Sequence, residues 1–135
     1  MNRRAFASTL GVAAALAVPG AALADATGTV PGLRAQVVRL LTAELHHDSS
    51  TVCAILNAPM NGTLRGVPCT TRWTRSLERI LSKPGARAAL RADIASAASA
   101  AVSSDGIHAS ITLPHPLLGG ESRFYWTNNC WMLMR

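Results

Sequence analysis

The spacing of the apolar residues changes once along this chain, near Gly85, and that change restricts the folds it can adopt. Before Gly85 the apolar residues recur at helical intervals, as they do on one face of a helix. Beyond Gly106 they alternate with polar residues, which is the pattern of a strand with one buried face. We therefore predict an α+β fold in which N-terminal helices pack on a curved antiparallel sheet.

The helical half of the chain is predicted to contain a helix pair and a third helix. The first helix covers residues 31–46 and carries a continuous apolar stripe. A short second helix covers residues 51–56, and the third covers residues 70–81. The first helix starts at a cap from Thr29 or Val30, with Pro31 in its first turn. Asp48, Ser49 and Ser50 break the chain and cap the second helix, which Pro59 ends. Thr70 or Thr71 caps the third helix, which Lys83-Pro84-Gly85 ends.

Residues 86–102 fit two structures. Alanine dominates this segment, and its intrinsic propensity favours a helix. Residues 94–102 also contain small residues that a strand tolerates, and they lead into the hairpin-turn signal Ser103-Ser104-Asp105-Gly106. The sequence leaves both structures open.

The rest of the chain is predicted to form strands. Residues 107–113 alternate apolar and polar side chains until Pro114 ends the strand. A final hairpin is predicted from strands over residues 123–127 and 130–134, because Asn128-Asn129 fits a two-residue turn. These strands complete the antiparallel sheet.

The start of the chain is predicted to be a cleaved export signal. Arg3 and Arg4 supply a positive end, and the apolar run over residues 10–18 is too short for a stable membrane anchor. Small residues at Ala22 and Ala24 place the cut after Ala24, and the arginine pair leaves the twin-arginine route open. The expected organisation is a signal peptide over 1–24, a short flexible N-terminus over 25–30 and one domain over 31–135, exported to the cell envelope, periplasm or medium.

Three cysteines in an exported chain predict at least one disulfide. Three pairings are possible, and the simplest joins Cys53 to Cys69 across a loop that contains proline and glycine. Closing that loop is worth roughly 3 kcal/mol by the chain-entropy estimate. Cys130 is then left as a small buried apolar residue, an intermolecular partner or a reactive thiol.

The chain is basic, with thirteen Lys and Arg residues against seven Asp and Glu and a formal net charge of +6. Only Lys83 is a lysine, and this bias together with the abundant alanine indicates a GC-rich bacterial coding sequence. The arginines are dispersed and no aromatic residues are interleaved with them, which argues against nucleic-acid binding. We expect at most peripheral contact with an anionic cell envelope.

A series of features along the chain matches one superfamily in order. They are the helix ending in Leu45, the segment 51–56 followed by Pro59 and Leu64, Cys69 entering the helix of Trp73, the turn Asp105-Gly106, and the final hairpin over residues 124–133. With these features in this order, the chain resembles small secreted actinobacterial proteins of the NTF2-like (cystatin-like) superfamily. The resemblance implies a cone-shaped roll in which a bent sheet wraps a long helix and leaves a pocket. The superfamily includes isomerases, dehydratases and members without known chemistry, so it implies no single activity.

One combination of side chains is a weak candidate for catalysis. Asp93, His108 and Tyr125 are the types that an isomerase uses, with the tyrosine donating to a developing enolate and the carboxylate moving the proton. The alternative is structural, because His108 falls on the polar side of its strand and Asp93 fits a solvated charge. No spacing in the sequence forces the three to converge, so we assign no catalytic residue.

The histidines do not predict a metal site. Adjacent residues of a helix point about 100° apart, so His46 and His47 cannot both face one ion. His115 lies between two prolines and is predicted to be a loop residue that faces water. We expect neither a metal nor a cofactor.

The aromatic residues offer a second weak site. Phe124 and Trp126 share one side of a strand, with Trp131 across the hairpin, which is the composition of a small core. The alternative is that these residues and Trp73 form the wall of an apolar pocket.

Taken together, these patterns favour a non-catalytic exported domain. We expect it to bind a small apolar ligand or a partner protein in its pocket, and not nucleic acid. The alternatives are a small isomerase or dehydratase on the same roll, and a cationic protein of the cell envelope.

Overall fold

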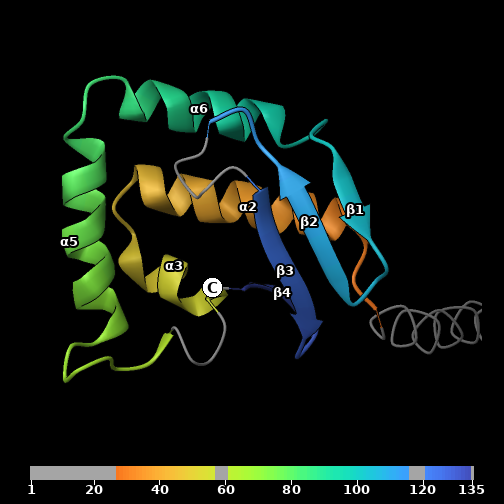
Figure 1. Cartoon of the computed structure of the whole chain (residues 1–135), viewed down its shortest axis with the longest axis horizontal. Coiled ribbons are helices and arrows are strands. Elements are labelled where there is room, and N and C mark those ends of the chain that lie inside the picture. Colours follow the sequence, from red (N-terminus) through yellow and green to blue (C-terminus); the bar gives the residue numbers. More distant parts are fainter. Residues whose placement is uncertain (1–26, 57–60, 116–120, 135) are drawn as a thin grey trace, which may run out of the picture.

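The computed structural model describes residues 27–56, 61–115 and 121–134, and within these ranges helices are followed by an antiparallel sheet (Figure 1). The predicted α+β class is confirmed. The predicted signal peptide over residues 1–24 lies outside the described residues. The elements are α2 (Val30–Leu45), α3 (Ser49–Ile55), α5 (Cys69–Leu81), α6 (Ala86–Ser96), β1 (Val102–Ser104), β2 (His108–Thr112), β3 (Glu121–Thr127) and β4 (Cys130–Leu133).

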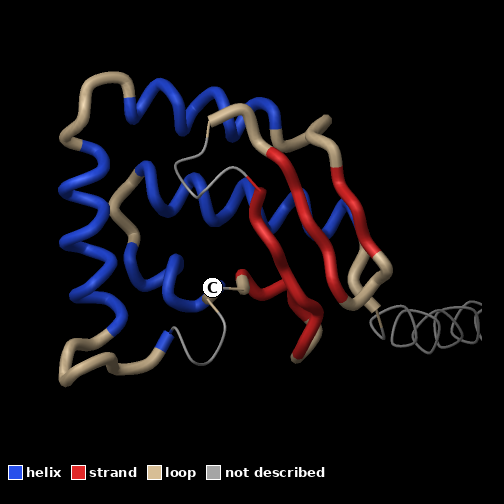
Figure 2. The backbone as a smooth tube through the Cα atoms, viewed as in Figure 1, coloured by secondary structure: helices blue, strands red, loops and turns tan. Residues whose placement is uncertain are grey.

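The helices lie on one face and at one end of the sheet (Figure 2). The strand order is β1-β2-β3-β4, and each strand is antiparallel to the next. In Figure 1, α2 runs behind the sheet, α6 lies along its upper end, and α5 stands at the left beside α3. The sheet therefore has one face against a helix, which explains the alternation of its side chains.

Thr29 sets the start of α2. The backbone N–H of Gly32 donates to its hydroxyl at 3.1 Å, and Pro31 occupies the first turn, where no N–H is needed. Of the two capping residues that the sequence allowed, Thr29 is the correct one. A side-chain hydrogen bond also joins α2 to β4, because Gln36 donates to the Trp131 carbonyl oxygen at 2.8 Å.

Asp48 starts α3, as the polar break in the sequence predicts. The Thr51 hydroxyl donates to one carboxylate oxygen at 2.6 Å, and the Thr51 backbone N–H donates to the other at 3.1 Å. These two hydrogen bonds favour the charged carboxylate and lower the pKa of Asp48.

The start of α5 differs from the prediction. The helix begins at Cys69, and the capping position is Pro68, whose side chain makes no capping hydrogen bond. The predicted cap from Thr70 or Thr71 is therefore wrong. Pro68 already holds an extended backbone ahead of the helix, and the disulfide fixes Cys69 in the first turn, so both threonines fall inside the helix.

The undecided segment over residues 86–102 contains both structures. Its alanine-rich first part is α6, and its last residue, Val102, begins β1. The turn signal that follows is confirmed, because β1 pairs with β2 and Val102 lies opposite Ile111. The final hairpin is also confirmed, with Asn128 and Asn129 at φ values of 50° and 58° in its two-residue turn.

The core fills the space between α2 and the inner face of the sheet. From the sheet, Phe124 and Trp131 are 1% and 2% exposed, and from α2, Leu33 and Leu40 are completely buried. Other large side chains that are fully buried come from every described layer: Leu41, Ile55, Leu56, Leu77, Leu90, Ile111, Leu133 and Val37. Large apolar side chains of both layers thus pack between α2 and the sheet, and a hollow of about 280 Å³ lies beside them, lined by Gly32 and Gln36 of α2 and by Trp126 and Trp131 of the final hairpin.

Candidate functional site: an arginine-lined hollow on α5

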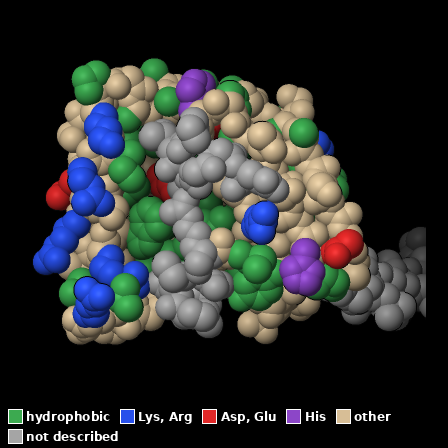
Figure 3. Space-filling view, in the orientation of Figure 1, with side chains coloured by type: hydrophobic (Ala, Val, Ile, Leu, Met, Phe, Trp, Pro, Cys, Tyr) green, Lys and Arg blue, Asp and Glu red, His purple; other side chains and the backbone are tan. Residues whose placement is uncertain are grey.

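The outward surface of α5 carries a hollow of about 620 Å³. Arg72, Arg75 and Arg79 lie three and four residues apart, so they follow one stripe of the helix. Arg65 joins them from the loop that precedes α5. Figure 3 shows the result, a column of Lys and Arg side chains at the left of the molecule, with apolar side chains among them and an acidic side chain at its outer edge. The arginine hollow, as we call it, is formed by these arginines together with Leu64, Trp73 and Ile80.

A tight turn positions Arg65 at the hollow. Leu64 and Val67 exchange backbone hydrogen bonds of 3.0 and 2.9 Å, which closes a turn around Arg65 and Gly66. Both central residues have positive φ, 51° for Arg65 and 77° for Gly66. Glycine adopts this left-handed region freely, but a side chain there costs about 1 to 2 kcal/mol. Arg65 is therefore held in an unfavourable backbone conformation.

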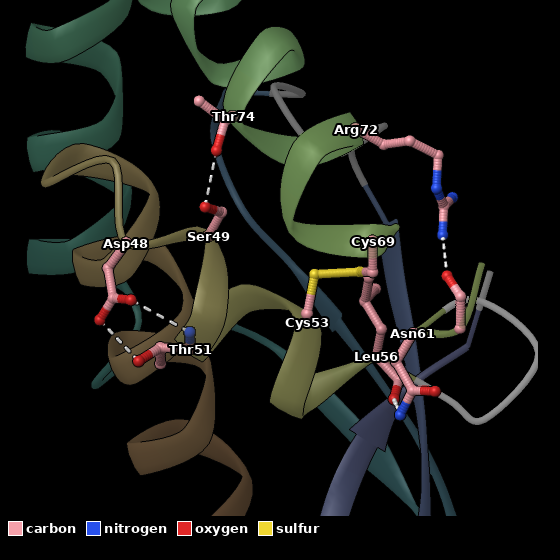
Figure 4. The surroundings of a disulfide bond; sticks show 10 residues. Asp48, Ser49, Thr51, Cys53, Leu56, Asn61, Cys69, Arg72 and Thr74 are labelled. Atoms are coloured by element: carbon pink, nitrogen blue, oxygen red, sulfur yellow. Dashed lines mark hydrogen bonds between the residues drawn. A yellow bond between two sulfur atoms is a disulfide. The ribbon is translucent and has the colours of Figure 1, made fainter. Parts of the chain in front are cut away.

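The disulfide fixes α5 and its arginines to the rest of the domain. Cys53 of α3 is bonded to Cys69 in the first turn of α5, which confirms the predicted pairing (Figure 4). A hydrogen bond of 2.8 Å between the Ser49 and Thr74 hydroxyls joins the same two helices one turn further along. The arginine hollow thus lies on a helix that is anchored at its start by a covalent bond.

The charges of the hollow are largely uncompensated. Arg72 donates to the Gly62 carbonyl oxygen at 2.7 Å (Figure 4). Arg65, Arg75 and Arg79 have exposed side chains that form neither a hydrogen bond nor a salt bridge with the described residues. No acidic residue is among the described residues that line the hollow. Three guanidinium groups are therefore available to an anionic ligand.

Asp93 forms a second polar feature at the end of α6. Its side chain is 1% exposed, and one carboxylate oxygen accepts from both the backbone N–H and the ring Nδ1 of His115, each at 3.0 Å. The His115 side chain remains 45% exposed. The buried carboxylate holds the segment after β2 against α6 and fixes the orientation of the imidazole.

Removing this carboxylate is expected to destabilise the domain. Asp93→Ala should lower the free energy of unfolding by about 2 kcal/mol, because both donors of His115 lose their acceptor. His115→Ala removes only the ring and leaves the backbone hydrogen bond, so its cost should be about 1 kcal/mol. Urea unfolding of both variants measures the difference. Equal costs would show that the backbone hydrogen bond to Asp93 contributes nothing.

The candidate acid/base set is divided between two places. His108 and Tyr125 lie directly opposite each other on β2 and β3. Asp93 bonds to His115 beyond the other end of β2, so its carboxylate is not directed at them. The Asp105 carboxylate lies 3.9 Å from the Nδ1 atom of His108. The backbone N–H groups of His108 and Ile107 donate to this carboxylate and lower the pKa of Asp105. The structure brings together two of the three residues.

Three of the four aromatic residues that were candidates for a ligand site lie together in the sheet, and Trp73 lies apart from them. Phe124 and Trp131 lie in the core, and Trp126 packs edge-on against Trp131 with ring centroids 5.5 Å apart. Trp73 lies on α5 at the arginine hollow. Cys130 is a free, half-buried thiol whose sulfur lies 3.3 Å from the Thr127 carbonyl oxygen.

Comparison with protein-family models, with curated proteins and with solved structures finds no match. Within the described ranges, no three His, Cys, Asp or Glu side chains form a group that could hold a metal ion. The described helices include none that is both long and apolar enough to cross a membrane.

The arginine hollow is a site that the sequence reasoning missed. The arginines are dispersed along the sequence, and their separation conceals the fact that Arg72, Arg75 and Arg79 share one face of a helix. That spacing lies within the predicted helix over residues 70–81, so a search for charged residues at helical intervals detects it. The contribution of Arg65 could not be detected in this way, because it depends on how the preceding loop folds.

Proposed function

We propose that this chain is an exported, non-catalytic domain that binds a partner protein through the arginine hollow. The observation that carries the proposal is the presence of three exposed guanidinium groups, from Arg65, Arg75 and Arg79, around a surface that also contains apolar side chains. An isolated charged patch favours encounter, but adjacent apolar area is what gives a protein interface its affinity.

The filled core favours a surface partner over an apolar ligand held inside the domain. Phe124 and Trp131 contribute their rings to the layer between the sheet and α2, where a ligand of the roll would be expected. The arginine hollow is open and lies on the outward side of α5 instead. A protein segment can reach such a site without rearrangement of the core.

Export is supported by the disulfide. A bond between Cys53 and Cys69 persists in oxidising compartments and is rare in a reducing cytosol. The paired arginines and the apolar run at the start of the chain support the same proposal, with the cut after Ala24.

Selection from a random peptide library displayed on phage tests the function. The disulfide-bonded protein should select peptides whose affinity falls more than about tenfold for Arg75→Glu/Arg79→Glu, because two attractive charges become repulsive. The matched control is Arg39→Glu/Arg91→Glu, which changes the net charge equally on exposed arginines of α2 and α6. Failure to select any peptide, or equal losses in the two double variants, would contradict the proposal.

A further inference from the structure

We infer that the partner segment is acidic, with an apolar side chain between its carboxylates, and that Arg65 determines this specificity. The inference rests on the proposed function and adds the chemistry of the partner. It follows from the backbone of Arg65, from the charge balance of the arginine hollow and from the apolar surface within it.

The backbone of Arg65 is unfavourable for an arginine. The turn from Leu64 to Val67 has positive φ at both central positions, and such turns favour Asn-Gly. Gly66 meets this preference and Arg65 does not. The Arg65 side chain is exposed and forms no hydrogen bond with the described residues, so no polar contact of this side chain within the described fold explains an arginine there. A contact with a partner supplies the reason for an arginine at this position.

The positive charge of the arginine hollow indicates that the partner segment carries carboxylates. Arg65 enters the hollow from the turn, and Arg75 and Arg79 enter it from α5, so positive charge reaches it from two elements. The nearest acidic residue along α5, Glu78, is exposed and is not among the described residues of the lining. A guanidinium fork binds a carboxylate through two parallel hydrogen bonds. Acidic side chains at several positions of one segment would satisfy the three groups together.

The apolar residues of the arginine hollow indicate that the partner segment carries an apolar side chain between its carboxylates. The Leu64 side chain is 55% exposed, and Trp73 and Ile80 are half-buried beside it. An apolar side chain placed on them removes water from the hollow, and charge pairs strengthen when water is excluded. The segment therefore combines charge with at least one apolar anchor.

A protein segment fits this surface better than a lipid membrane does. Membrane-surface proteins insert aromatic and apolar side chains that project into the acyl boundary. Trp73 instead packs against the core, and the apolar surface lies within a concavity bordered by arginines. A flat layer of headgroups could reach the exposed guanidinium groups and Leu64, but it would make little contact with the half-buried Trp73 and Ile80.

The peptides selected on the wild-type protein provide the test. They should carry Asp or Glu on both sides of an apolar residue, and their affinity should fall as salt rises. Arg65→Asn should weaken binding about tenfold, because it removes a charge-assisted hydrogen bond. The same variant should keep or raise the melting temperature, because asparagine is tolerated at positive φ. A gain in stability with a loss of binding is a result that a merely structural role of Arg65 would not give.

Two further variants and one further probe complete the experiment. Arg65→Lys keeps the charge and should lose less affinity than Arg65→Asn, whereas Arg91→Gln on α6 should leave affinity unchanged. Selected peptides that need Arg75 and Arg79 but lack carboxylates, or that bind Arg65→Asn equally well, would overturn the inference and leave the proposed function intact. Arg65-dependent binding to phosphatidylglycerol vesicles, with no effect of Arg65→Asn on peptide binding, would also overturn it, in favour of a membrane surface.

Discussion

Replacing Phe124 with alanine is expected to lower the free energy of unfolding by about 4 kcal/mol. The Phe124 ring is 1% exposed and lies in the core between β3 and α2, so the substitution removes buried apolar surface and leaves a cavity. A domain of this size is stable by only about 5 to 15 kcal/mol, so the loss should be obvious in urea or thermal unfolding.

The neighbouring residue provides the control for this prediction. Tyr125 is on the same strand but on the opposite face, where it is half-exposed beside His108. Tyr125→Ala should cost less than about 1 kcal/mol, since it removes mainly a cross-strand contact. If the two variants unfolded at similar denaturant concentrations, the assignment of the inner and outer faces of the sheet would be wrong.

Removal of the disulfide should cost about 3 kcal/mol. The bond joins residues separated by 16 positions, and the double variant Cys53→Ser/Cys69→Ser releases that constraint on the unfolded chain. A reducing agent should have the same effect on the wild-type protein and none on the double variant. Unfolding in urea with and without reductant measures both.

The same substitution should also affect the proposed site. α5 begins at Cys69, so loss of the bond frees the start of the helix that carries Arg72, Arg75 and Arg79. Peptide affinity should then fall under conditions in which the domain remains folded. Cys130→Ser is the matched control, because this thiol is free and half-buried. A Cys130→Ser variant as unstable as the double variant would contradict the assigned role of the disulfide.

The elements of the fold were largely predictable because they depend on local periodicity. The apolar stripe that ends at Leu45 and the alternation over residues 109–113 each report which side of an element is buried. Ile107, which the alternation also placed on the buried side, is exposed because β2 begins only at His108. The start of α5 was less predictable, because the local preference of Thr70 and Thr71 for a capping position was overridden by Pro68 and the disulfide.

The candidate site was only partly predictable. Three of its arginines share a helix face, and the sequence contains that spacing. The pairing of Asp93 with His115 joins residues 22 positions apart and depends on where the chain returns after β2. The predicted solvated charge at Asp93 is therefore wrong, because the carboxylate is buried in the fold and accepts hydrogen bonds from His115.

By itself the sequence determined that helices precede strands and where two hairpin turns lie, because each of these depends on residues that are near neighbours along the chain. It left residues 86–102 open between helix and strand, and it favoured the pairing of Cys53 with Cys69 without excluding the other two. Only the tertiary structure decided that Phe124 and Trp131 fill the core, that Asp93 is buried against His115, and that Arg65 reaches the arginines of α5. These contacts are made when the elements pack together, and the packing depends on the shapes and charges of side chains that are distant in sequence.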